Sequence, residues 1–206
     1  MAGKGEETRE RILDRAQAMI LECGYAGVSI DKLIQSLGLT KGAFFHHFRN
    51  KNDLARSLIR RYADQGLELF SDNLARAKKL TDDPLQQFLV LIGLYEEIFE
   101  DLTEPYPGCL LASYVYELQQ FDEQTRAIIN EEFVLSRAEL SKLIGEIMTI
   151  HPPCRDVDPV SLADGFMSVF EGAFILSKSL DEADITIQQL RHYKNYIELI
   201  FTRSDV

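Results

Sequence analysis

The chain is poor in cysteine and in long apolar runs, and both absences limit what it can be. Its three cysteines, Cys23, Cys109 and Cys154, are scattered and form neither a CxxC pair nor a zinc-ligand spacing. We therefore expect reduced thiols, no metal site and no cofactor. No apolar run approaches the roughly 18 to 20 residues of a membrane-spanning helix, and the polar start does not resemble a signal peptide. These features favour a cytoplasmic protein with no membrane partner.

Signals for β-structure and for catalysis are also missing. No segment alternates apolar and polar residues over the length of a strand. The motifs HExxH and GxSxG and glycine-rich phosphate loops are absent, and the four histidines are not placed for catalysis. The sequence therefore predicts an all-α chain that is not an enzyme. An all-α interaction adaptor or ligand carrier stays open as an alternative.

Positive charge is scarce in the chain as a whole but is concentrated near its start. The net charge is −11. Residues 1–62 contain 11 Lys and Arg against 7 Asp and Glu, whereas the remaining residues contain 11 against 26. Such asymmetry indicates a basic binding module joined to an acidic body. Unevenly charged solvated faces would give the same counts.

Apolar residues recur with helical spacing along nearly the whole chain. In residues 30–37, for example, four apolar residues follow at positions i, i+3, i+4 and i+7 and so share one helical face. Ser29 is a suitable N-cap for this helix, and Gly38 is a suitable stop. The expected helices, about nine in all, cover residues 8–23, 30–37, 40–48, 51–79, 84–102, 108–119, 122–150, 159–180 and 184–202.

Residues 29–48 have the spacing of a helix-turn-helix unit. A short helix follows Ser29, a turn contains Gly38, and a second short helix follows Thr40. Glycine can take the left-handed backbone conformation that such a tight turn needs. The second helix of such a unit lies in the major groove of DNA. Helix pairs of this geometry also occur in all-α proteins that bind no DNA, so the spacing alone leaves both alternatives open.

The second short helix divides into an inner and an outer face. At 100° per residue, Phe44 and Phe48 share one side and are expected in the core. His46 lies nearly opposite them, with Gly42 and Ala43 beside it. The two small residues would let the backbone approach base edges, and the Ala43 methyl could meet a thymine methyl.

Cationic and polar residues flank this outer face. Thr40 and Lys41 lie at the start of the helix, where the helix dipole attracts phosphate. Lys51 opens the next helix within reach of the same DNA backbone. A metal site at His46 and His47 is not expected, because neighbouring side chains point about 100° apart and no third ligand is in view.

The segment TRERILDRAQAMILECGYAGVSIDKLIQSLGLTKGAFFHHFRNKNDL closely resembles the DNA-binding domain of TetR-family transcriptional regulators. The resemblance covers roughly residues 6–66 and combines R-I-L-x-x-A, G-Y-x-x-x-S-I, G-L-T-K-G and F-x-x-F-x-N-K-x-x-L. It implies a helix-turn-helix DNA-binding domain over residues 1–50. A helical ligand-binding and dimerisation domain would then occupy residues 51–206.

The family pattern implies a set of DNA contacts. Ala43, Phe45 and His46 resemble groove-facing positions, and the polar residues around them resemble phosphate contacts. One position departs from the pattern, because the family commonly has Tyr where this chain has Phe45, which lacks the hydroxyl. The implied DNA-binding residues are Thr8, Ser29, Thr40, Lys41, Gly42, Ala43, Phe45, His46, His47 and Lys51.

The acidic body is expected to enclose a small-molecule effector. Aromatic side chains with a few hydroxyls suit a small, partly apolar ligand, and core packing is the alternative for each residue. The stretch PGCLL around Cys109 resembles a segment in one branch of the family, some members of which sense electrophiles through this cysteine. An inert buried thiol is the alternative there. The candidate ligand residues are Phe88, Ile92, Tyr95, Phe99, Tyr106, Cys109, Tyr114, Phe133, Phe166 and Phe170.

The resemblance also implies a homodimer whose last two helices pair with those of a second copy. The expected interface residues are Phe174, Tyr193, Tyr196, Ile197, Ile200 and Phe201. Two-fold symmetry would match a pseudo-palindromic operator in double-stranded DNA. The sequence therefore predicts a repressor that leaves its operator when a small-molecule ligand or a thiol-reactive electrophile binds.

Overall fold

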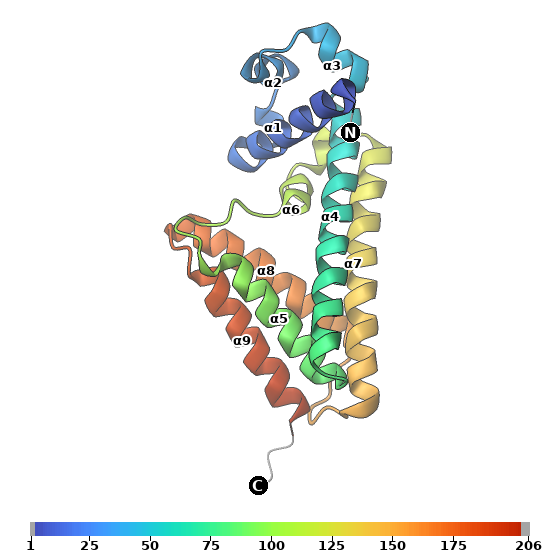
Figure 1. Cartoon of the computed structure of the whole chain (residues 1–206), viewed down its shortest axis with the longest axis vertical. Helices are drawn as coiled ribbons and strands as arrows, with labels where there is room; N and C mark the ends of the chain where they lie inside the picture. Colours follow the sequence, from blue (N-terminus) through green and yellow to red (C-terminus); the bar gives the residue numbers. More distant parts are fainter. Residues whose placement is uncertain (1–2, 203–206) are drawn as a thin grey trace. The chain divides into compact units, whose positions relative to one another are not determined.

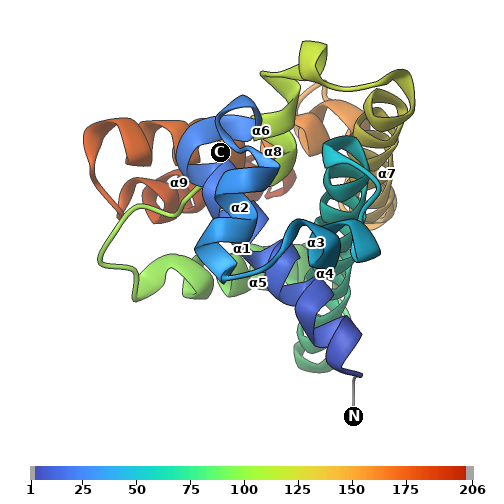
Figure 2. The same cartoon turned by 90° about the horizontal axis from the view of Figure 1, so that it is seen from above.

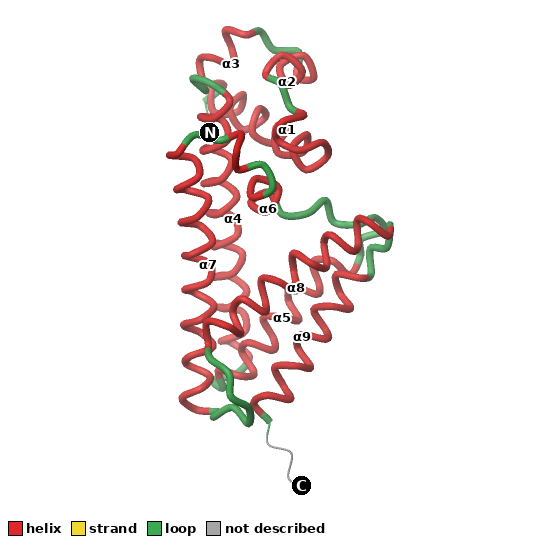
Figure 3. Tube along the Cα trace, turned by 180° about the vertical axis from the view of Figure 1, so that it is seen from behind, coloured by secondary structure: helices red, strands yellow, loops and turns green. Residues whose placement is uncertain are grey.

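The computed structural model describes residues 3–202, apart from the side chain of Lys4, and the regular elements in that range are all helical. Figure 3 shows these helices in red, joined by green loops. The predicted all-α fold is confirmed. The described part contains α1 (Lys4–Gly27), α2 (Ile30–Leu37), α3 (Lys41–His47), α4 (Lys51–Leu80), α5 (Pro84–Glu100), α6 (Leu110–Val115), a 3-10 helix η1 (Leu118–Gln120), α7 (Glu123–Ile150), α8 (Pro159–Leu180) and α9 (Ile185–Phe201).

The caps that define the helix-turn-helix unit lie where the sequence predicts them. The hydroxyl of Ser29 accepts a hydrogen bond from the backbone N–H of Lys32 at 3.2 Å, which caps α2. Gly38 ends α2 in the left-handed conformation, with φ 66°. The hydroxyl of Thr40 accepts from the N–H of Ala43 at 3.2 Å and so caps α3.

Two helices differ from the sequence prediction. Helix α1 begins earlier than expected, with Glu6 and Glu7 in its first turn, where acidic side chains favour a helix N-terminus. It also continues past a break at Gly24, where φ is 75°. The single helix predicted over residues 108–119 is instead the short α6 followed by η1. Glu117, between the two, has the non-helical angles φ −122° and ψ 27°, and its carboxylate binds the backbone of a distant segment.

The chain divides into two compact units that differ from the expected domains. Unit 1 comprises Met1–Gln65 and Gly108–Glu132, and unit 2 comprises Gly66–Pro107 and Phe133–Val206. The predicted boundary lies near residue 50, whereas unit 1 includes the first part of α4 through residue 65. The segment 108–132 joins unit 1 because α6 packs on α1. The outer ends of both expected domains, residues 1–2 and 203–206, lie outside the described residues.

Unit 1 is built on the apolar face of α1. Ile12, Leu13 and Ala16 are fully buried, and α2 packs on α1 while α3 packs on α2. Figure 2 shows these three helices together. The guanidinium of Arg61 on α4 lies 3.0 Å from Glu10 and 2.7 Å from Asp14 of α1. It also donates to Gln17 at 3.1 Å, so α1 and α4 are joined by polar contacts as well as by the core.

Unit 2 contains α5, α8 and α9, which lie side by side in Figure 1. Its core is rich in aromatic rings, with Phe88, Phe166 and Tyr193 in mutual contact at centroid distances of 5.4 to 6.5 Å. By length and composition alone, α8 is long and apolar enough to cross a membrane. An 18-residue window of this helix has a mean hydropathy of 1.3, and one third of the window is buried. This differs from the expectation that no segment reaches that length.

Candidate nucleic-acid interface

Helix α3 has an inner and an outer face, as the sequence predicts. Phe44 and Phe48 are buried, with 0% and 1% of their surfaces exposed, and their rings pack 5.6 Å apart. Phe45 is 51% exposed, and His46, which lies nearly opposite Phe44 on the helix, is also exposed. Of the remaining candidates on α3, Lys41 and Gly42 are exposed, whereas Ala43 and His47 are half-buried.

The start of α2 lies beside this outer face. A depression of about 450 Å³ is lined by residues of α2, α3 and the first turn of α4. Lys41 forms an ion pair with Asp31 at 2.8 Å, in which both side chains remain about two thirds exposed. Such an exposed pair is weak, so a phosphate group could replace the carboxylate. The lining residues are Val28, Ser29, Ile30, Asp31, Lys41, Phe45 and Lys51.

Two expected phosphate contacts have other surroundings in the structure. The ammonium group of Lys51 donates a hydrogen bond to the backbone carbonyl of Tyr25 and lies 3.8 Å from the centre of the Tyr25 ring. Burial lowers the pKa of Lys51, and the nearby Glu117 carboxylate opposes that shift. Lys51 therefore supports the fold of unit 1 as well as lining the depression. Thr8 lies half-buried on α1.

The adjacent histidines differ in their surroundings. Their rings meet edge to face with centroids 5.0 Å apart. Partial burial lowers the pKa of His47, and the positive charges of His46 and Arg9 lower it further while Glu6 opposes them. His47 is therefore largely neutral at pH 7 in the free protein. Among residues 3–202, no group of three or more His, Cys, Asp or Glu side chains is arranged to hold a metal ion.

The ten candidate ligand residues are divided between the two units. Six aromatic side chains of unit 2 form a continuous series of ring contacts with centroid distances of 4.9 to 6.1 Å. They are Phe88, Tyr95, Phe99, Tyr106, Phe166 and Phe170. Ile92 is fully buried in the same unit, and Phe133 is half-buried at its α7 boundary. Burial raises the pKa of the Tyr95 hydroxyl to about 12, so this group stays protonated.

Cys109 and Tyr114 belong to unit 1. The Tyr114 ring packs against Phe121 at 4.8 Å and Tyr25 at 5.5 Å, and its buried hydroxyl has no hydrogen-bond partner. Tyr114, a candidate ligand residue, is thus fully buried among aromatic rings of unit 1, apart from the aromatic candidates of unit 2. Cys109 is half-buried at the N-cap of α6.

Most of the expected dimer residues point into unit 2. Phe174, Tyr193, Ile197, Ile200 and Phe201 are each less than 9% exposed in the single chain, so they are core residues. Their apolar character reflects packing of α8 and α9 within one copy. Of the expected set, Tyr196 alone is well exposed, at 47%.

The exposed apolar residues of α8 and α9 lie on the other side of these helices. Ile175 and Leu176 of α8 are about half exposed, and Leu199 of α9 is 70% exposed. A Cβ added at Gly172, one turn before Ile175 and Leu176, would meet no other group within 4 Å. The sequence periodicity identified amphipathic helices here, but the two apolar faces could not be told apart without knowing which one packs on α5.

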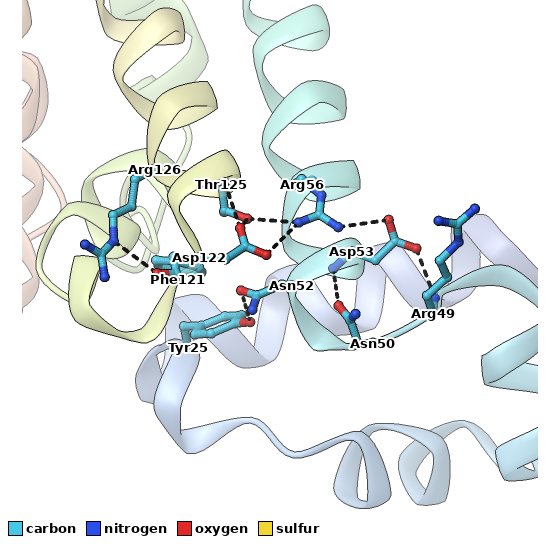
Figure 4. A network of polar contacts seen from close by, with 10 residues as sticks. All are labelled: Tyr25, Arg49, Asn50, Asn52, Asp53, Arg56, Phe121, Asp122, Thr125 and Arg126. Carbon is cyan, nitrogen blue, oxygen red and sulfur yellow. Dashed lines mark hydrogen bonds and ion pairs between the residues drawn. The ribbon is translucent and has the colours of Figure 1, made fainter.

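Sequence reasoning missed a polar network that joins residues 108–132 to the rest of unit 1. Figure 4 shows Arg56 of α4 donating to Asp122 at 3.0 Å and to Thr125 at 3.3 Å. Asp122 in turn caps α7 through the N–H of Thr125 at 2.9 Å, and its pKa is lowered mainly by hydrogen bonds from Thr125. Only the N-cap position of Asp122 has a local sequence signal.

A second missed contact involves Glu117, which is half-buried between α6 and η1. Its carboxylate oxygens accept hydrogen bonds from the backbone N–H groups of Tyr25 at 2.6 Å and Ala26 at 2.8 Å. These partners lie 92 and 91 residues away in the chain. No local pattern could have indicated this pairing.

Comparison with known proteins places this geometry among bacterial regulators. Residues 12–58 match the family model described as bacterial regulatory proteins, tetR family. The chain is 25% identical over 162 residues to the transcriptional regulator AcuR of Cereibacter sphaeroides, covering 77% of this chain and 71% of AcuR. It is 25% identical over 172 residues to the HTH-type transcriptional repressor DhaR of a Mycobacterium species, covering 82% of each.

The fold of the whole chain has similar matches among solved structures. A TetR-family transcriptional regulator from Agrobacterium tumefaciens superimposes with a TM-score of 0.79 at 22% identity, covering 97% of this chain and 100% of that one. The likeness therefore extends beyond the helix-turn-helix segment to both compact units.

Proposed function

We propose that this chain is a cytoplasmic repressor of the TetR family, a family of DNA-binding transcriptional regulators and not of enzymes, and that it binds DNA upstream of its own gene. As a homodimer it binds a pseudo-palindromic operator, and a small-molecule effector or a thiol-reactive electrophile releases it. The observation that supports this proposal most directly is the difference between the two faces at α3. Phe44 and Phe48 are buried, whereas Phe45 and His46 are exposed.

The proposed DNA surface uses side chains of α2 and α3. Lys41 exchanges Asp31 for a phosphate, and His46 and Phe45 approach base edges in the major groove. Small side chains at Gly42 and Ala43 allow close contact. Each lysine–phosphate contact releases counterions, so affinity falls steeply as salt rises.

The proposed effector site uses the aromatic series of unit 2. Tyr95 and Phe170 are half-buried members of that series, with ring centroids 5.4 Å apart. Tyr95 keeps its proton and can donate a hydrogen bond to a ligand oxygen or nitrogen. The site therefore suits a small, largely apolar molecule that carries a hydrogen-bond acceptor.

The electrophile alternative rests on Cys109. Its half-buried sulfur lies at the start of α6, and α6 packs on α1 within unit 1. With an activated alkene as the electrophile, Sγ forms a bond to the β-carbon while the C=C π bond opens. The thiol proton passes to solvent, and the α-carbon takes up a proton from solvent. The bulk of the adduct would then disturb the packing of α6. If a Cys109→Ser variant leaves DNA in response to an electrophile as readily as the parent, this alternative fails.

The proposed dimer surface differs from the one expected from sequence. It consists of Ile175 and Leu176 of α8 and Tyr196 and Leu199 of α9, four of the exposed apolar residues of these helices. A second copy would cover these side chains, and the open position at Gly172 would allow close helix packing. The two copies would then present two α3 helices to the two halves of an operator.

A gel shift with DNA upstream of the chain's own gene tests the proposal. The parent should bind one duplex at a protein concentration that leaves a shuffled duplex free. The double variant Lys41→Ala, His46→Ala should lose at least tenfold in affinity, since each contact contributes about 1 kcal/mol or more. Lys142→Ala, an exposed change in unit 2, is the matched control. Absence of any specific duplex would instead favour the adaptor alternative.

A further inference from the structure

Helix α1 is broken at Gly24, and the break is tied to Glu117. Gly24 has φ 75° and ψ 164°, a backbone conformation that residues other than glycine rarely adopt. A Cβ at this position would lie 2.6 Å from Oε1 of Glu117. The backbone conformation and the close approach of the carboxylate therefore both require glycine.

The break exposes two backbone donors that Glu117 satisfies. N–H groups that follow a helix break have no acceptor in the preceding turn. The N–H of Tyr25 donates to Oε1 at 2.6 Å, and the N–H of Ala26 donates to Oε2 at 2.8 Å. Hydrogen bonds to a carboxylate are stronger than those to neutral acceptors. One side chain thus fixes two consecutive peptide groups.

Tyr25 is held at its other groups too. Lys51 donates to its carbonyl, and the ring packs 4.3 Å from Phe121 and 5.5 Å from Tyr114. The hydroxyl donates to Asn52 at 3.5 Å. Tyr25 is 3% exposed. The turn after Gly24 is therefore held by contacts with α4 and by contacts with the segment 108–132, all within unit 1.

We propose that Glu117 is a positioning residue for DNA recognition, and this inference rests on the proposed function. The turn that it fixes leads through Val28 directly into Ser29, the N-cap of α2. Val28 and Ser29 line the depression that also contains Lys41 and Phe45. Glu117 touches no DNA itself. It sets where Ser29 and the start of α2 lie relative to α3, so the DNA surface depends on a segment outside the helix-turn-helix unit.

The first test compares full-length variants on the duplex identified by gel shift. Glu117→Ala should bind about tenfold more weakly, and Glu117→Gln should also weaken binding because its amide NH2 cannot accept from an N–H. Gln119→Ala, an exposed change in the same segment, is the matched control and should bind as the parent does. Hydrogen exchange at the amides of Tyr25 and Ala26 should be faster in both Glu117 variants. Parent-like affinity and parent-like exchange would overturn the proposal.

A double-mutant cycle separates positioning from simple loss of stability. Ser29→Asp keeps an N-cap side chain but places negative charge against phosphate, so it should weaken binding about tenfold in the parent. In Glu117→Ala, where Ser29 is no longer held in place, the same change should weaken binding less than about threefold. His46→Ala should have the same effect in both backgrounds. Equal effects of Ser29→Asp in both would contradict positioning.

The two hypotheses can fail separately. If Glu117→Ala proves unfolded by circular dichroism, the cycle is run with Glu117→Gln, which keeps the size of the side chain. If the folded parent binds no duplex specifically, the proposed function fails, and with it the role of Glu117 in recognition. If the parent binds but both Glu117 variants match it, the role of Glu117 alone is rejected.

Discussion

At the scale of single residues, α3 packs in the core on one side and presents the proposed DNA surface on the other. Its seven residues include a fully buried Phe44 and an exposed His46. The angular sorting of the sequence predicted this contrast, because a helix of known register fixes which side each residue faces. What the angles could not predict is the partner of Lys51, which depends on the carbonyl of Tyr25 and so on tertiary structure.

Phe45→Tyr should strengthen operator binding. The ring is 51% exposed, so the added hydroxyl needs no buried partner and can donate to a phosphate oxygen. A single hydrogen bond of this kind contributes about 1 kcal/mol, or about fivefold in affinity. Fluorescence anisotropy with labelled operator measures the change. Phe44→Tyr is the contrasting control, because its hydroxyl would be buried in the core and should lower the melting temperature.

DNA affinity should rise as pH falls through the region near and below 6.5. In the free protein the pKa of His47 lies below that ordinary value, because partial burial and the charges of His46 and Arg9 disfavour the imidazolium. Phosphate groups favour the imidazolium, so binding takes up a proton and strengthens with acidity.

The measurement is operator affinity from pH 8 to 5.5 at constant ionic strength. His47→Gln should flatten part of this slope, whereas His151→Gln, in unit 2, should leave it unchanged. A slope that persists in full without His47 would refute this assignment.

At the scale of elements, the helix caps were predictable from sequence, whereas the long-range side-chain contacts were not. Ser29, Gly38, Thr40 and Asp158 mark helix ends through contacts with residues at most four positions away. Local sequence contains all the information for such caps. The carboxylate of Glu117, two residues after the end of α6, instead binds amides more than ninety residues away, and no periodicity reveals that pairing.

Arg61→Met should lower the free energy of unfolding by about 1 to 2 kcal/mol. The change removes a guanidinium that contacts Glu10, Asp14 and Gln17 of α1 while keeping much of the apolar stem. The estimate is modest because Glu10 and Asp14 are 42% and 73% exposed. Urea unfolding gives the value. Arg60→Met, an exposed neighbour on α4, should change it little.

Gly24→Ala and Gly66→Ala should change stability in opposite directions. At Gly24 the new methyl meets the Glu117 carboxylate at 2.6 Å in a backbone conformation with positive φ, which costs about 1 to 3 kcal/mol. At Gly66, inside α4, a Cβ meets nothing within 4 Å and the helix gains about 1 kcal/mol. Thermal unfolding compares the two. Equal behaviour would show that Gly24 is not held in the conformation described.

At the scale of the whole molecule, the fold class and the resemblance to the TetR family were readable from sequence, whereas the division into units was not. The motifs from Arg11 to Leu54 produce this resemblance because they combine caps, a turn and core positions in one short segment. The inclusion of residues 108–132 in unit 1 depends on packing of α6 against α1. The burial of five of the six expected dimer residues within unit 2 was not readable for a related reason, since two apolar faces of one helix look alike in sequence.

Leu199→Glu should convert the dimer to a monomer and abolish tight operator binding. Leu199 is 70% exposed and is a member of the proposed dimer surface, so a buried carboxylate there would be unpaired in the dimer. Analytical ultracentrifugation and gel shift test both results. Val134→Glu, at a 51% exposed apolar residue of α7, is the matched control and should leave the dimer intact.

The most direct test of the account is a hydroxyl-radical footprint of the parent protein on DNA upstream of its own gene. The account predicts two protected half-sites, related by a pseudo-two-fold axis and separated by about one helical turn of DNA. Protection should disappear in the Lys41→Ala, His46→Ala variant and persist in Lys142→Ala. A single unpaired site, or protection that survives the loss of Lys41 and His46, would contradict recognition by paired α3 helices.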